Sequence, residues 1–259
     1  MVTFPLFGDI FSLAFGLAIG SFLNVCIYRI PEKRSIVRPP SSCPHCGERI
    51  RFYDNIPLIS YLFLLGKCRH CHRPISWQYP LVEALTGALS LFLYIRYGWS
   101  FQYLFSLAFG TTLVTISFID LKHQIIPDIL SLPGILAGWA VSFFFSNGFW
   151  LDSLIGSAAG GGALFLVAFV YEHLTGREGI GGGDIKLLAM IGAWMGWRAL
   201  PLILLISSLT GAVIGAIFLL LAGRGYRARI PFGPFLSLGA MLHLFWGPQL
   251  TRWYLGLFT

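Results

Sequence analysis

Four cysteines in two closely spaced pairs are the first residues whose spacing predicts chemistry. Cys43 and Cys46 form one Cys-x-x-Cys pair, and Cys68 and Cys71 form a second pair after 21 intervening residues. Two such pairs can place four thiolates tetrahedrally around one zinc ion, and four sulfurs leave no open position for catalysis. Gly47 follows the first pair and permits the tight turn that such a site needs. We therefore expect a structural zinc ion bound by the four cysteines.

These cysteines have other interpretations as well. They could form a redox-active thiol pair or remain without a ligand, and a neighbouring histidine (His45, His70 or His72) could replace one of the sulfurs. The four-sulfur set is the simplest interpretation. The fifth cysteine, Cys26, lies in an apolar stretch and is expected to be an ordinary buried thiol.

Two aspartates form the second candidate site. Asp120 ends one apolar stretch, and Asp184 begins another one 64 positions later, directly after the glycine run 181–183. Ionisable groups at a membrane are costly and usually functional. Two carboxylates in one site acquire different pKa values, so one can activate water while the other protonates a leaving amine. The pair therefore suggests an aspartic peptidase, and the glycines would let the backbone of a substrate approach closely.

The aspartates also allow alternatives. Asp128 and Asp184 could each cap the start of a helix or interact with its dipole, whereas Asp120 stands at a helix C-terminal end, where the dipole disfavours negative charge. Ion pairs with Lys122 or Lys186 are another possibility. A third is a proton-coupled transporter that uses Asp120 and Asp184 as a relay, although such a protein would want its acids near the middle of the membrane.

The elements that must position these residues are predicted by composition. Of 259 residues, 56% are hydrophobic and 11% are charged, against roughly 25% charged in soluble domains. One soluble core could not bury so much apolar surface, and disorder requires low hydrophobicity. We predict an all-α polytopic membrane protein with about eight transmembrane helices, near 6–27, 80–97, 101–119, 129–146, 153–174, 184–197, 199–222 and 232–248. Glycines at 156 and 160–162 suit close helix packing.

The basic residues predict the topology. If eight spans alternate, 15 of the 18 lysines and arginines share one side, leaving Arg96, Arg198 and Arg252 on the other. Short loops rich in Lys and Arg stay in the cytoplasm, so the polar segment 28–79, with nine of them, should be cytoplasmic. Topology thus explains the net charge of +7 without nucleic acid as a partner. The expected domains are a first helix (1–27), a zinc-binding cytoplasmic loop domain (28–79) and a seven-helix membrane peptidase domain (80–259).

Several segments, in this order, resemble the type IV prepilin peptidases, which are bacterial membrane aspartic peptidases with a GxGD signature. That signature corresponds here to Gly181-Gly182-Gly183-Asp184, and the segment 118–128 resembles the motif around the first catalytic aspartate. The resemblance covers nearly the whole chain. It also includes the double Cys-x-x-Cys loop and the segments Gly20–Val25 with Tyr28-Arg29, Asp54–Pro57, Tyr79–Glu83 and Pro231–Phe235.

The resemblance implies the catalytic pair Asp120 and Asp184 and an active site on the cytoplasmic side of the bacterial inner membrane. Such enzymes cleave the basic leader of prepilins or pseudopilins just before the hydrophobic stretch, and many then methylate the new N-terminus with S-adenosyl-L-methionine. No methyl-donor motif is visible, so no residues are assigned to this cofactor; Glu83 is a weak candidate that could instead pair with Arg73 or Arg96. The chain departs from the family at Lys122, where a second acid is frequent.

Overall fold

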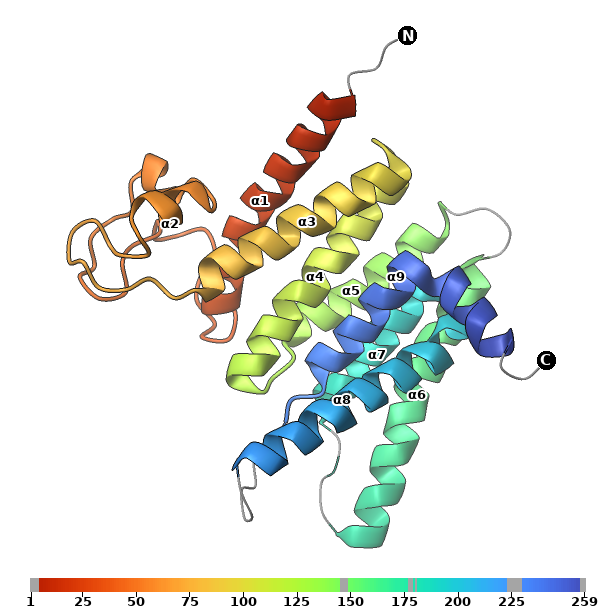
Figure 1. Cartoon of the computed structure of the whole chain (residues 1–259). Helices are drawn as coiled ribbons and strands as arrows, with labels where there is room; N and C mark the ends of the chain where they lie inside the picture. The colour runs from red at the N-terminus through yellow and green to blue at the C-terminus, as the bar shows by residue number, and fades with distance from the viewer. Residues whose placement is uncertain (1–4, 145–148, 177–178, 180, 223–229, 257–259) are drawn as a thin grey trace. The chain divides into compact units, whose positions relative to one another are not determined.

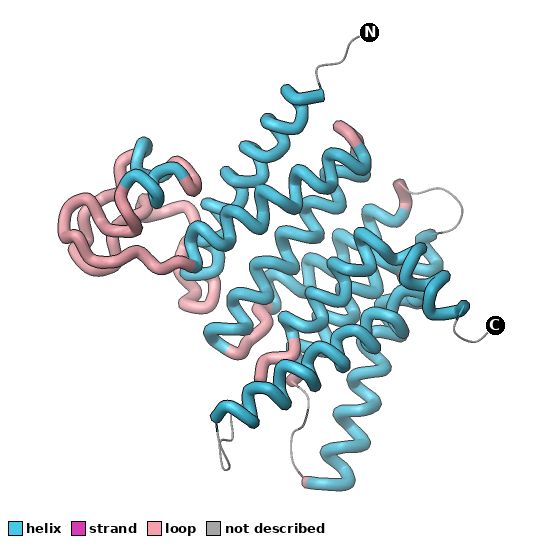
Figure 2. The backbone as a smooth tube through the Cα atoms, in the orientation of Figure 1, coloured by secondary structure: helices cyan, strands magenta, loops and turns pink. Residues whose placement is uncertain are grey.

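The computed structural model describes residues 5–144, 149–176, 179, 181–222 and 230–256. Within these ranges the chain is almost entirely helical, and its only β-pairing is two isolated bridges, Ser42 with Arg49 and Lys67 with Pro74 (Figure 2). The helices are α1 (Pro5–Arg29), α2 (Ile59–Phe63), α3 (Gln78–Tyr97), α4 (Phe101–His123), α5 (Asp128–Ser142), α6 (Phe149–Thr175), α7 (Gly182–Met195), α8 (Leu200–Ala222) and α9 (Gly233–Gly256), with short 3-10 turns η1 (Phe52–Asn55) and η2 (Trp197–Ala199).

The helices form two compact units, Met1–Thr115 and Ile116–Thr259. In the first unit, α1 and α3 pack along each other, and the segment between them forms a small loop domain (Figure 1). The two helices approach closely because Gly20 has no side chain: a Cβ there would lie 2.7 Å from the Cα of Glu83. Small residues allow such close packing without any hydrophobic drive from lipid.

In the second unit, α7 lies against α5, α6 and α9, and α8 packs on α9 (Figure 1). The α6–α7 contact is made backbone to backbone, since a Cβ on Gly156 or on Gly192 would overlap the carbonyl group of the other. Gly160 also packs closely, with 2.6 Å from a Cβ there to the carbonyl oxygen of Leu188. The predicted packing role is therefore confirmed for Gly156 and Gly160, whereas a Cβ at Gly162 would meet no described atom within 4 Å. This contact fixes the position of α7, which carries Asp184.

The prediction of an all-α membrane protein is confirmed. Each of the eight predicted stretches coincides with a helix, except that residues 145–146 of the stretch 129–146 lie outside the described residues. Four described helical stretches are long and apolar enough to cross a membrane: Leu6–Arg29, Phe101–His123, Phe149–Thr175 and Trp197–Phe218. The count of eight crossings stays a prediction, because among the described residues only these four stretches are both long and apolar enough, and α5 and α7 have only 15 and 14 residues. At 1.5 Å per residue these helices are about 21–23 Å long, which is less than the roughly 30 Å of a hydrocarbon core.

Candidate active site and metal centre

Asp120 lies in the last turn of α4 and is buried, with only 5% of its surface exposed. Its Oδ2 accepts a hydrogen bond of 3.0 Å from the backbone N–H of Gly233, the first residue of α9. A Cβ at Gly233 would lie 2.6 Å from the same oxygen, so this approach requires glycine. The start of α9 is therefore fitted directly to the carboxylate of Asp120.

The chain turns sharply after Asp120. Gln124 adopts a left-handed conformation (φ +54°), and its N–H donates to the carbonyl oxygen of Asp120 at 2.9 Å, which ends α4. Pro127 then precedes the first residue of α5. Between them Ile126 is buried, and it packs against two glycines at once: a Cβ would lie 2.9 Å from it at Gly183 and 3.2 Å from it at Gly233.

Asp184 is brought to the same place by the first turn of α7. Its backbone N–H donates to the carbonyl oxygen of Gly181 at 3.0 Å, and Gly181 is the N-cap residue of the helix, without a side-chain cap. The carboxylates of Asp184 and Asp120 are close enough to interact electrostatically. Asp184 is therefore within electrostatic reach of Asp120. Its place in the first turn of α7 fits an interaction with the helix dipole, whereas the alternative in which it is the N-cap residue is wrong.

The glycines before Asp184 have two different surroundings. Glycine is required at position 183 by packing inside the protein, because any side chain there would overlap Ile126. By contrast, among the described residues a Cβ at Gly182 would meet nothing within 4 Å, and one at Gly181 would meet only Oδ2 of Asp184, at 3.6 Å. The carboxylate of half-buried Asp184 therefore borders open space along this backbone. An extended peptide could approach it there.

Asp128 and Lys122, the neighbouring charged residues, differ from Asp120 in their exposure. Asp128 is the first residue of α5 rather than its cap, and its carboxylate forms an exposed ion pair of 2.6 Å with the amino group of Lys186. The expected capping role of Asp128 is therefore wrong. Lys122 is exposed on α4 while Asp120 is buried, in keeping with the different directions of side chains two residues apart on a helix.

The four cysteines lie together in the loop domain. Their sulfur atoms are all within 4.8 Å of one another, and those of Cys43 and Cys71 are 3.8 Å apart. Four ligands at about 2.3 Å from one zinc ion would be separated by about 3.8 Å, so the set fits zinc. The cluster contains the four cysteines and none of the nearby histidines. Cys26 is buried in α1, as expected.

The two cysteine pairs are built in the same way. In the first, the N–H of Gly47 donates to the carbonyl oxygen of Cys43; in the second, the N–H of His72 donates to that of Cys68. Both turn residues have positive φ, +72° at Gly47 and +54° at His72. The predicted turn at Gly47 is confirmed, and His72 takes the equivalent position rather than binding as a ligand.

Polar contacts complete the cysteine cluster. Hydrogen bonds from the backbone of Cys71 and His70 lower the pKa of Cys68 to about 6. Arg69, between the second pair, donates from Nε to Asp54 at 2.9 Å and 3.1 Å. These hydrogen bonds hold the pKa of Asp54 below its usual value and tie the segment 54–57 to the second pair.

Comparison with known proteins matches both units. Residues 14–97 match the bacterial peptidase A24 N-terminal domain, and residues 107–216 match the type IV leader peptidase family. The chain belongs to the type IV leader peptidase family. Proteins named prepilin leader peptidase/N-methyltransferase are similar over nearly their whole length: 39% identical in Pseudomonas aeruginosa (98% of this chain, 96% of the relative), 42% in Aeromonas hydrophila (95% and 93%) and 39% in Legionella pneumophila (99% and 97%). No solved structure matches.

Two further segments of this leader peptidase pack on each other. Asn24 in α1 donates from Nδ2 to the carbonyl oxygen of Tyr79 at 3.1 Å, and Ser21 bonds to the carboxylate of Glu83. Glu83 is buried and also accepts from the N–H of Leu58 at 2.8 Å. Its described partners are therefore these groups and not Arg73, and Glu83 ties the loop domain to α1 and α3.

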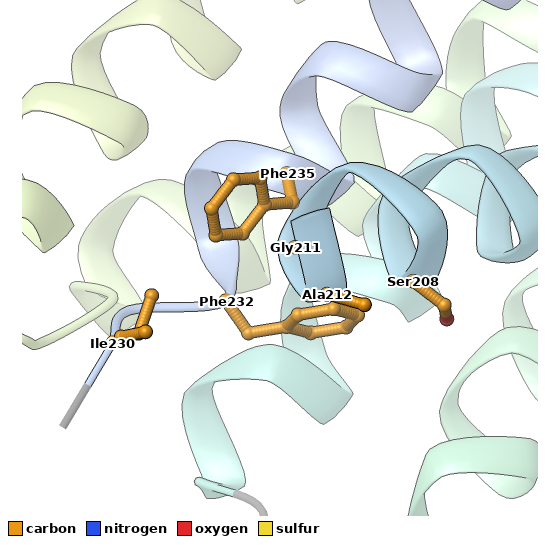
Figure 3. Close-up of a pocket in the computed structure, with 6 residues that line it drawn as sticks. All are labelled: Ser208, Gly211, Ala212, Ile230, Phe232 and Phe235. Atoms are coloured by element: carbon orange, nitrogen blue, oxygen red, sulfur yellow. The ribbon is translucent and has the colours of Figure 1, made fainter. Parts of the chain in front are cut away.

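The role of the α8–α9 region in this leader peptidase was not predicted from sequence. The segment 231–235 resembled the family, yet nothing showed that Gly233 donates to Asp120, because a backbone contact leaves no trace in residue type. The same region contains an open groove of about 340 Å³ between α8 and the start of α9. It is lined by Ser208, Gly211, Ala212, Ile230, Phe232 and Phe235 (Figure 3).

Proposed function

We propose that this chain is a membrane aspartic endopeptidase that removes the leader from type IV prepilins or pseudopilins at the cytoplasmic face of the bacterial inner membrane, and then methylates the new N-terminus. The observation that carries the proposal is the meeting of Asp120 and Asp184 at two helix ends, in a chain about 40% identical to prepilin leader peptidases over nearly its full length. The positions of both aspartates at helix ends do not suit a proton relay through the middle of a membrane.

The geometry supports a two-carboxylate mechanism. Like charges at one site favour a single shared proton, so the ionised carboxylate takes a proton from water and the protonated one donates to the leaving amine. The N–H of Gly233 holds the carboxylate of Asp120 in place, and the open space at Gly181 and Gly182 admits the substrate backbone beside Asp184. Asp120 is thus held in place by its buried surroundings, whereas Asp184 is the carboxylate that the substrate reaches from the open side.

The cysteine cluster fits a structural zinc ion. Cys43, Cys46, Cys68 and Cys71 would hold it, and their four thiolates leave no open coordination position for water. The loop domain needs such a support, because Cys43 and Ser60 are the only buried residues between 28 and 79. Zinc would therefore replace the core that this segment does not have.

S-adenosyl-L-methionine would be the methyl donor, as the name of the relatives implies. A second cavity lies beside the first-helix motif and is lined in part by Ser21, Arg29 and Asn55, but its volume of about 260 Å³ is below the roughly 300–1,000 Å³ of small-molecule sites. This cavity does not fit the group as it stands. No residue of this chain is therefore assigned to binding of the methyl donor.

Replacement of one carboxylate tests the peptidase assignment. We expect Asp120→Asn and Asp184→Asn each to abolish leader cleavage, because one carboxamide can neither accept nor donate the shared proton. Mass spectrometry of a co-expressed prepilin reports leader loss and the N-methyl mass increment together. Retained cleavage in both variants, with both inserted in the membrane, would overturn the assignment.

A further inference from the structure

The short helix α2 of the loop domain presents an exposed apolar surface. Ile59, Leu62, Phe63 and Leu65 are all more than half exposed, and Phe63 and Leu65 are each 84% exposed. We call these four residues the α2 patch. Contiguous apolar patches of this kind mark a surface that binds another protein or a membrane.

The backbone at both ends of α2 makes its leucines unusual. Leu58 before the helix and Leu65 after it have positive φ values, +58° and +51°, a conformation that glycine and asparagine adopt more readily. An exposed leucine gains nothing from water at such a position. In an apolar environment, by contrast, the burial of its side chain is favourable.

Helix α2 is attached at the level of a helix that can cross a membrane. The N–H of Leu58 donates to the carboxylate of Glu83 at 2.8 Å, and Ser21 in α1 bonds to the same carboxylate. At 1.5 Å per residue, Ser21 lies about 12 Å before Arg29, the last residue of α1. The start of α2 is therefore attached beside α1 and not beyond its end (Figure 1), near the depth that the apolar faces of interfacial helices reach.

The charges of the loop domain suit an acidic lipid surface. Between residues 28 and 79 there are nine basic residues and three acidic ones. Lys67 is exposed, and its N–H donates to the carbonyl oxygen of Leu64 at 3.0 Å, which holds it close to the end of α2. Anionic headgroups attract basic residues that lie near the membrane surface.

We propose that the α2 patch inserts into the boundary between headgroups and acyl chains beside α1, and that the loop domain binds acidic phospholipids there. A protein partner or a second copy of this chain would have to displace the lipid that already surrounds α1. The inference depends on the membrane crossing of α1 and not on the peptidase chemistry. Insertion of the α2 patch would give the loop domain a second attachment to the membrane, in addition to the helices at its two ends.

Photo-cross-linking from the α2 patch tests this proposal. The full-length protein carries p-benzoylphenylalanine in place of Phe63, in nanodiscs with equal amounts of phosphatidylcholine and phosphatidylglycerol. Mass spectrometry then identifies the molecules that are cross-linked. The control carries the same group in place of Glu48, which is exposed in the turn of the first cysteine pair.

We expect lipid adducts at position 63 and about tenfold fewer at position 48, because a charged segment of the loop stays in water. Adducts with phosphatidylglycerol should exceed those with phosphatidylcholine about fivefold, which corresponds to the roughly 1 kcal/mol that one basic residue contributes near an anionic surface.

Loss of the apolar side chains provides the second measurement. With the cross-linker at position 63, Leu62→Ser together with Leu65→Ser should reduce the lipid adducts about tenfold, the factor for burial of one such side chain. Val37→Ser is the matched control, because Val37 is 76% exposed but lies outside the α2 patch, and it should change the yield by about twofold or less. Unchanged protection of residues 28–79 from added protease shows that the loop domain of each variant remains folded.

Cross-links between two copies of the chain in place of lipid adducts would overturn the proposal, and so would equal lipid adducts at positions 63 and 48. An equal yield with the two phospholipids, or an unchanged yield in the double serine variant, would also overturn it. None of these results affects the proposed peptidase function, which is measured separately by leader cleavage.

Discussion

At the scale of single residues, the aspartate site depends on groups that carry no ionisable side chain. Asp120 is held by the N–H of Gly233, and Ile126 packs against both Gly183 and Gly233. Both aspartates could be selected from the sequence because acids are rare among apolar stretches. Their surroundings could not, because hydrogen bonds to the backbone and contacts with glycine depend on where distant segments meet.

Gly233→Ala should impair catalysis without unfolding the protein. The new Cβ would lie 2.6 Å from Oδ2 of Asp120 and must displace it. A displacement of about 1 Å at reacting groups can reduce the rate by about a hundredfold, so we expect kcat for leader cleavage to fall by a factor of that order. Gly162→Ala is the control, because nothing lies within 4 Å of its new methyl group. Equal activity of the two variants would contradict the fitted contact.

Asp128→Asn separates the role of the ion pair from that of the proposed catalytic pair, Asp120 and Asp184. The contact of Asp128 with Lys186 is exposed on both sides, and such pairs contribute about 0–1 kcal/mol to stability. We expect leader cleavage to stay within about threefold of the wild-type rate and the melting temperature to change little. A loss of cleavage as complete as that expected for Asp120→Asn would place Asp128 in the chemistry instead.

At the scale of helices, apolar stretches predicted all eight longer helices, because a segment that lies in lipid must satisfy its backbone hydrogen bonds internally and so forms a helix. The helix ends were less predictable. Helix α4 continues past Asp120 to His123 and ends at Gln124, a residue without the usual signal of a left-handed position. Asp184 is in the first turn of α7 but does not cap it, since the cap position is taken by Gly181.

Gly192→Ala tests the packing of α6 on α7. The added methyl group would overlap the backbone of Gly156, and overpacking of this kind destabilises by about 1–3 kcal/mol. We expect a lower melting temperature in detergent and, since α7 carries Asp184, slower leader cleavage. In the Gly162→Ala control, helix propensity alone should raise stability slightly. An unchanged melting temperature in Gly192→Ala would show that the two helices can separate freely.

At the scale of the whole molecule, the charged residues are concentrated in a few segments of the chain. Nine of the 18 basic residues lie in the loop between 28 and 79, and this segment holds the cysteine cluster. The spacing of the cysteines predicted the cluster because short motifs impose local geometry. The contact between the loop and Glu83 could not be predicted, because it joins a backbone N–H to a side chain 25 positions away.

Removal of metal should unfold the loop domain and spare the membrane helices. We expect about one zinc ion per chain by elemental analysis, and less in Cys46→Ser. Chelation should expose residues 28–79 to added protease, because zinc sites of this kind contribute folding free energy directly. Circular dichroism should show that most helix is retained. Resistance to protease in the metal-free protein would mean that the loop holds its structure without an ion.

The shortness of α7 has a consequence for the lipid around the enzyme. If α7 crosses the membrane as predicted, its length of about 21 Å cannot match a hydrocarbon layer of roughly 30 Å, and a helix that is too short is accommodated by local thinning of the bilayer. Thinning would lower the water boundary toward Asp184 in the first turn of α7. Hydrolysis would then take place where the bilayer is locally thinned. The acyl-chain length of the surrounding lipids would therefore affect the rate at which pilin subunits are processed.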